Sequence, residues 1–296
     1  MSGCGLLIEG TRRSAAFQPW RGQLDLRYQR QGDQTQLRHQ YARAPLKVQR
    51  PFYPEGPTVC HTVMLHTAGG IVGGDRLQQT IDLGRDTAAL LTTAAATKIY
   101  RSNGAIAQQN ITIQLAPGAV LEWLPQEAIV FNGARFEQNL RVELAPGATF
   151  LGWEIVRFGR SARGEQFVSG DWRSRLEIWQ DGRPLWLDRQ WLPGAPETFH
   201  SPNALAGCPV VGSLVWLGLP LTAEFIEQAQ AALTERSHCH HAAGGVTPTL
   251  GDGLLCRYRG TSTTAARQAL TAVWQLLRVK LAIAPCQRCA SGPEPL

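Results

Sequence analysis

The chain has 296 residues, of which 44% are hydrophobic and 18% charged, so it can form a packed core and is not expected to be disordered as a whole. Its net charge of +6 comes from arginines scattered along the sequence, without the basic, aromatic-rich stripe typical of nucleic-acid binding. No basic start followed by a long apolar run is present, and the most apolar stretch, residues 210–219, is too short to cross a bilayer. We therefore expect a cytoplasmic protein that binds neither nucleic acid nor a membrane.

Strand patterns dominate the first two thirds of the chain. Residues 23–28 alternate polar and apolar side chains, which predicts a half-buried strand. Three later segments repeat one unit, in which a strand ends at a leucine, a four-residue turn follows and a second apolar strand begins. These leucines are Leu83, Leu115 and Leu144, 32 (115 − 83) and 29 (144 − 115) residues apart. This spacing predicts the stacked strands of a β-helix or solenoid, although a sheet of successive hairpins would look much the same.

The last third of the sequence changes character after a hairpin. Residues 176–187 read as two alternating strands joined at Asp181-Gly182, a strong hairpin signal. Residues 222–233 then predict a helix capped by Thr222, and residues 264–284 predict a longer one with a single apolar face, closed by Pro285. We expect a mainly β fold with two helices in the C-terminal third.

No clear domain boundary interrupts the sequence. We expect one domain over residues 1–296, with an N-terminal extension at 1–16 and a flexible tail at 285–296, where glycine and proline are frequent.

Residues 65–77, LHTAGGIVGGDRL, form the most unusual segment. Four glycines, Gly69, Gly70, Gly73 and Gly74, precede Asp75, and such density indicates positive φ angles or close backbone approach. The spacing is neither GxGxxG nor GxxxxGK[ST], so a phosphate cradle is rejected. A tight bend and a metal contact both remain open, because Cys60, His61, His66 and Asp75 are donors for a borderline divalent ion.

Several carboxylates lie inside apolar strands: Glu122, Glu127, Glu154 and Asp188. Any that point inward must be paired, hydrated or metal-bound, since burial of a lone charge is costly. Arg157 and Arg189 are the nearest candidate partners in the sequence. Several inward acids together would instead indicate a wet interior passage.

Two short groups suggest a second metal-binding interpretation. His238, Cys239, His240 and His241 are consecutive, and Cys286 and Cys289 form a CxxC pair further on. Such ligands bind zinc or nickel, although the spacing is not that of a zinc finger. An alternative function is therefore a stand-alone nickel- or zinc-binding protein. A second alternative is a metal-dependent hydrolase built on His66 and Asp75.

The segments VQRPFYPEG, LHTAGGIVGGDRL, TKIYRS, LEWLPQEAIVFNGA and GWEIVRFGR, the last followed by GEQF, are together specific. In this order they resemble the urease accessory protein UreD family, also called UreH. The resemblance runs from about Phe17 to Ala284, which is nearly the whole chain.

The resemblance implies a scaffold that is not an enzyme, with a β-helical body and two helices. Members bind UreF, which carries the GTPase UreG, and dock on urease apoprotein. Nickel then passes to the urease active site through a polar interior channel, so Ni²⁺ would be transient and no cofactor tightly bound. Carried over by motif, Asp75, Thr97, Glu154 and Asp188 would line this channel, with His66 and Lys98 as secondary candidates.

Overall fold

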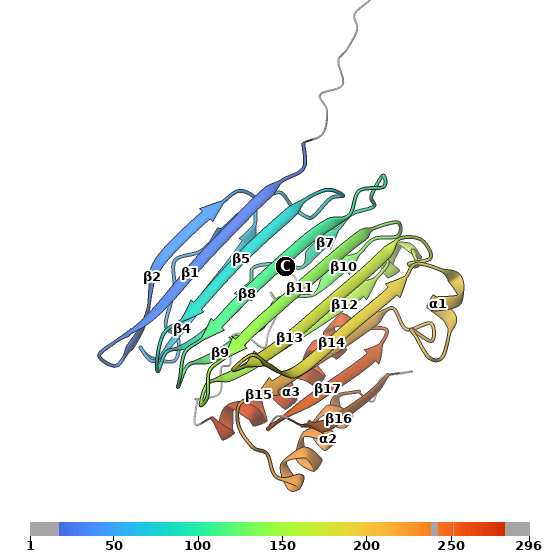
Figure 1. Cartoon of the computed structure of the whole chain (residues 1–296). Coiled ribbons are helices and arrows are strands. Elements are labelled where there is room, and N and C mark those ends of the chain that lie inside the picture. Colours follow the sequence, from blue (N-terminus) through green and yellow to red (C-terminus); the bar gives the residue numbers. More distant parts are fainter. Residues whose placement is uncertain (1–17, 238–241, 251, 282–296) are drawn as a thin grey trace, which may run out of the picture.

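The computed structural model describes residues 18–237, 242–250 and 252–281. These residues form two large β-sheets that face each other, with helices against the outer face of one of them (Figure 1). The seven-stranded sheet has the order β14 (Arg183–Pro193), β13 (Asp171–Gln180), β11 (Arg135–Leu144), β8 (Ala107–Leu115), β5 (Arg76–Leu83), β1 (Arg21–Gln31) and β2 (Gln34–Arg43).

The second sheet has ten strands. Its main order is β16 (Ala243–Thr249), β17 (Gly253–Gly260), β15 (Val210–Leu217), β12 (Thr149–Phe158), β9 (Val120–Trp123), β6 (Ala88–Thr93), β4 (Val59–His66) and β3 (Leu46–Val48). Two short strands, β7 (Thr97–Ile99) and β10 (Ala128–Val130), pair with each other, and β10 also pairs with the end of β12.

The parallel strands are successive turns of a β-solenoid of about 4 turns, as predicted. β5 pairs with β8 and β8 with β11, all parallel, which places Leu83 beside Leu115 and Leu115 beside Leu144. Strands that follow each other in the sequence, such as β5 and β6, belong to different sheets. The alternative of successive hairpins is therefore wrong for these units.

The predicted hairpin and helices are confirmed, with small changes at their ends. β13 and β14 pair across Asp181 and Gly182, whose φ angles are 49° and 73°. The two long helices are α2 (Ala223–Ser237), where Thr222 Oγ1 accepts a hydrogen bond from the Phe225 amide, and α3 (Thr263–Lys280). A short helix α1 (Pro196–His200) and a 3₁₀ turn, η1 (Ser161–Arg163), were not predicted.

The two sheets differ in how their faces are covered. The ten-stranded sheet contributes neighbouring residues to two apolar cores: Phe150 packs in the core between the sheets and Leu151 in the core under α3. Only the inner face of the seven-stranded sheet is covered by the rest of the chain. The side chains along its strands therefore alternate between buried and more exposed positions. No helix among the described residues has the length and apolar character needed to cross a membrane.

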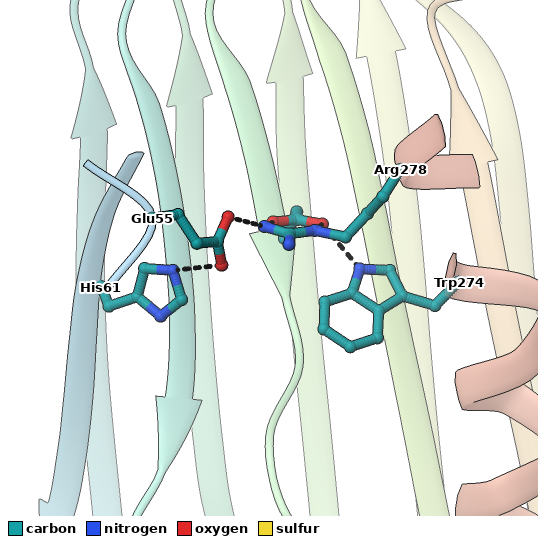
Figure 2. Close-up of polar contacts among 5 residues, drawn as sticks. Glu55, His61, Trp274 and Arg278 are labelled. Carbon is teal, nitrogen blue, oxygen red and sulfur yellow. Dashed lines mark hydrogen bonds and ion pairs between the residues drawn. The ribbon is translucent and has the colours of Figure 1, made fainter. Parts of the chain in front are cut away.

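Helix α3 is attached to the ten-stranded sheet by a buried charged network (Figure 2). Arg278, which has no exposed surface, lies 2.9 Å from Glu122 of β9 through Nε and 2.7 Å from Glu55 through Nη2. Trp274 Nε1 donates to Glu122 Oε1 at 2.6 Å, and His61 Nε2 lies 3.0 Å from Glu55. Glu122, expected to be paired or metal-bound, is therefore paired.

Candidate functional site

The glycine-rich segment 65–77 is a tight corner between two solenoid strands. Gly69, Gly70 and Gly74 have φ angles of 74°, 152° and 93°, values that residues other than glycine rarely adopt. At Gly70 a Cβ would overlap the carbonyl oxygen of Lys98, so the backbones approach too closely for any side chain. In the structure this segment is a bend whose backbone favours glycine at these positions.

Asp75 holds this corner together. Its two carboxylate oxygens accept hydrogen bonds from the backbone amides of Trp20, at 2.8 Å, and Val72, at 2.9 Å, and its side chain is fully buried. It does not belong to the lining of the cavity described below. The structure therefore gives Asp75 a visible part in shaping the loop, while its predicted part in a channel stays a prediction.

A cavity of about 400 Å³ lies between the two sheets. Thr97, Glu154, Asp188, His66 and Lys98, which come from three strands of the solenoid and one hairpin strand, all contribute to its lining. Five of the six residues carried over from the family resemblance thus meet at one cavity, although they are spread over more than a hundred positions of sequence.

Two rows of polar side chains run along the axis of the solenoid beside this cavity. On the seven-stranded sheet, the residues in register on β8, β11, β13 and β14 are Gln109, Gln138, Ser174 and Gln190. On the ten-stranded sheet, Glu154 of β12 is in register with Ser213 of β15, and Ser213 with Arg257 of β17. Sequence analysis missed both rows, because it shows alternation within a strand but not which strands align.

Glu154 lies where the two rows meet. It accepts a hydrogen bond of 2.7 Å from Gln138 Nε2, and the Ser174 hydroxyl lies 3.1 Å from both of its carboxylate oxygens. Burial, and then the nearby Asp188 carboxylate, raise the pKa of Glu154 to about 7, while Ser174, Gln138 and Arg257 oppose the shift. This carboxyl therefore changes its charge near neutral pH.

Asp188 is the second acid of the cavity. Its Oδ2 lies 2.7 Å from Arg257 Nη2 and accepts a hydrogen bond of 3.1 Å from Gln190. The partner expected from the sequence, Arg189, instead pairs with Glu177 on the outer face of the sheet. Adjacent residues of a strand point to opposite faces, so Arg189 is not placed to reach Asp188.

Two further polar groups of the lining lack a partner. Both ring nitrogens of His66 are buried without a hydrogen bond, and burial lowers the pKa of this imidazole, opposed by the charge of Asp75. Gln79 is only 5% exposed, and its Oε1 also has no partner. A neutral imidazole nitrogen and an amide oxygen each carry a lone pair, which can bind a divalent cation or accept a hydrogen bond from a water molecule.

The remaining sequence candidates either lie outside the described residues or have partners elsewhere in the fold. His238, Cys239, His240, His241, Cys286 and Cys289 lie outside the described residues. Within residues 18–237, 242–250 and 252–281, no cluster of three or more His, Cys, Asp or Glu side chains is placed to hold a metal ion. Glu127, another acid of the apolar strands, pairs with Arg267 of α3.

These features define a class of protein, a β-solenoid with a cavity between its sheets along which polar side chains are aligned. Residues 21–290 match the family described as UreD urease accessory protein, and the chain belongs to that family.

Two similar proteins agree with this assignment. The chain is 60% identical over 259 residues to a protein of Nostoc sp. (strain PCC 7120 / SAG 25.82 / UTEX 2576), covering 88% of this chain and 91% of the relative. It is 58% identical over 267 residues to a protein of Trichormus variabilis (strain ATCC 29413 / PCC 7937), covering 90% and 94%. Both relatives are named urease accessory protein UreD, which indicates a non-catalytic role.

Proposed function

We propose that this protein is a cytoplasmic scaffold of urease maturation, and that nickel on its way to urease passes through the cavity between its sheets. The observation that carries the proposal is that Thr97, Glu154 and Asp188, from separate strands, line one cavity. Membership of the UreD family supports the link to urease maturation.

The chemistry of the lining suits transit better than storage. Nickel is held tightly by nitrogen and sulfur donors, whereas this cavity offers carboxylate, amide and hydroxyl oxygens with His66 as a neutral imidazole. The described residues hold no three-donor cluster that would fix the ion. In this proposal nickel is cargo for the chain and not a resident cofactor.

The partners in this proposal are UreF, the GTPase UreG and urease apoprotein. The chain itself contains no GxxxxGK[ST] segment, so GTP binding through such a loop is assigned to UreG. The scaffold would hold UreF and urease apoprotein together while nickel moves between them.

The test is urease activity in cells that express urease apoprotein, UreF and UreG with nickel, and with this chain intact, absent or altered. The altered chain carries Glu154→Gln and Asp188→Asn, which remove both charges from the cavity but keep the side-chain size. Glu177→Gln is the matched control, because Glu177 lies on β13 and pairs with Arg189 on the outer face.

We expect activity to need the chain, to fall at least about tenfold with the double change and to stay normal with the control, while co-purification shows that the complex still assembles. If the chain is needed but the double change has no effect, it is a scaffold whose cavity carries no nickel. If omission of the chain leaves activity unchanged, the whole proposal is overturned.

A further inference from the structure

We propose that the ion pair between Arg257 and Asp188 is a gate at one end of the cavity, shut in this structure, which cations pass only when Arg257 moves outward. The inference rests on the proposed function, since it assigns a controlling residue to the same cavity. Arg257 would act as a positioning residue, because it sets whether Asp188 is available and does not itself bind a cation.

The position of Arg257 in the solenoid supports this role. The row Glu154, Ser213, Arg257 runs across β12, β15 and β17 toward the edge of the ten-stranded sheet, where only β16 follows. Asp188 lies on β14, the edge strand of the opposite sheet. The Arg257–Asp188 pair therefore links the two sheets at the end of the described solenoid, where β14 and β17 lie near each other in Figure 1.

The contacts of Arg257 place its guanidinium between the cavity and the solvent. Nη2 lies 2.7 Å from Asp188 Oδ2, and Nη1 donates to the Ser213 hydroxyl. Asp188 and Ser213 both line the cavity, whereas Arg257 does not. The Arg257 side chain is 38% exposed and that of Asp188 only 11%. In this proposal the guanidinium, which is bonded to two lining residues and partly open to solvent, covers this end of the cavity from outside.

The charges explain why this closure would stop a cation. With Arg257 in place, Asp188 is neutralised and a positive guanidinium stands at the end of the polar row, so an approaching divalent ion is repelled. When Arg257 turns to solvent, Asp188 is left as an unpaired carboxylate beside Glu154, and the same end becomes attractive. Because a guanidinium pairs strongly with a carboxylate, a carboxylate outside the cavity is the group best suited to draw Arg257 outward.

A merely structural ion pair would hold β14 and β17 together and have no effect on cation uptake. The two roles are separated by the rate at which Ni²⁺ quenches tryptophan fluorescence, because Trp153 and Trp172 both line the cavity. Stopped-flow mixing of the purified full chain with Ni²⁺ gives this rate. The starting chain has His238, Cys239, His240 and His241 replaced by alanine, so that nickel held by that segment does not contribute.

The deciding variant is Arg257→Met, which removes the charge and keeps most of the side-chain length. We expect quenching about tenfold faster than in the starting chain, because the repelling charge is lost and Asp188 is released. Arg257→Lys should stay near the starting rate. The matched control is Arg189→Met, which removes the same charge from the residue next to Asp188, where the side chain is 67% exposed and points outward.

The proposal is overturned if Arg257→Met and Arg189→Met quench at the same rate, or if Arg257→Met only lowers the melting temperature. Glu154→Gln separates this result from failure of the proposed function. If Glu154→Gln slows quenching while Arg257→Met does not change it, the cavity carries nickel but Arg257 is not its gate. If neither variant changes quenching and the cellular assay is also unaffected by cavity changes, both proposals fail.

Discussion

Arg278 of α3 and Glu122 of β9 lie 156 positions apart in the sequence and meet through two hydrogen bonds of 2.9 Å, with almost no exposed surface on either side chain. The same guanidinium also holds Glu55, which in turn contacts His61 (Figure 2). One cation therefore pairs with two buried carboxylates and ties α3 to the ten-stranded sheet.

Arg278→Met is expected to destabilise the fold by about 3–5 kcal/mol, because it leaves two buried carboxylates without their cation. Urea unfolding followed by circular dichroism measures the change. Lys280→Met, two residues further along α3 and exposed, is the control and should cost less than about 0.5 kcal/mol. The double variant Glu122→Gln/Arg278→Met should recover part of the loss; equal stability of the Arg278→Met and Lys280→Met variants would contradict the network's importance.

Glu154 predicts a pH dependence of stability. Its pKa of about 7 lies above the ordinary carboxyl value, so the folded chain holds this proton more tightly than the unfolded chain. The resulting stabilisation is fully present below the ordinary carboxyl pKa and is lost as the pH rises through about 7. Glu154→Gln cannot lose a proton, so its melting temperature should rise relative to wild type between about pH 5 and pH 8.

The control for this measurement is Glu177→Gln, on the outer face of β13. Its melting-temperature difference from wild type should lack that rise through pH 7. A flat difference for Glu154→Gln across the same range would show that the folded and unfolded chains hold this proton equally well, and would overturn the prediction.

Gly70→Ala is expected to cost about 2–4 kcal/mol, because a Cβ at this position overlaps the Lys98 carbonyl oxygen and the Tyr100 ring, and the φ angle of 152° is strained for alanine. Gly69→Ala is a matched neighbour with open space around its Cβ and a φ angle of 74°, and should cost about 1 kcal/mol. Chemical unfolding of the two variants side by side checks the difference. Equal losses would mean that strain at φ, and not close approach, requires glycine at this corner.

Asp75→Ala separates the two parts considered for this residue. It leaves the buried amides of Trp20 and Val72 without their acceptor, so we expect a loss of about 3 kcal/mol in stability. Nickel quenching by the chain that remains folded should keep the wild-type rate if Asp75 only shapes the loop. A slower rate in a fully folded variant would instead support a channel role.

The sequence could predict features that depend on local order along the chain. The spacing of Leu83, Leu115 and Leu144 reports a period of one solenoid turn, and Asp181-Gly182 reports a turn whose φ angles need those residue types. The repeat and the turn each depend on residues that are close together in the sequence, and the structure confirms both.

The partners across the cavity could not be predicted in the same way. Alternation along β14 places Asp188 on the same face as Gln190, but nothing in that strand indicates that β17 brings Arg257 opposite it. Likewise, Glu122 in the apolar segment LEWLP gives no sign that a helix from the end of the chain supplies Arg278. Long-range pairing of charges depends on the assembled fold, so only the presence of inward acids was visible beforehand.

The solenoid also fixes distances inside the molecule. Thr97, Ala128 and Val156 lie side by side on β7, β10 and β12, so each turn advances the interior by one strand spacing, about 4.8 Å. In a relative with one repeat of some thirty residues more or fewer, the two ends of the cavity would be about 4.8 Å further apart or closer together. The width of the cavity would stay the same. The number of repeats therefore sets the distance at which two proteins docked at the two ends of the solenoid would be held.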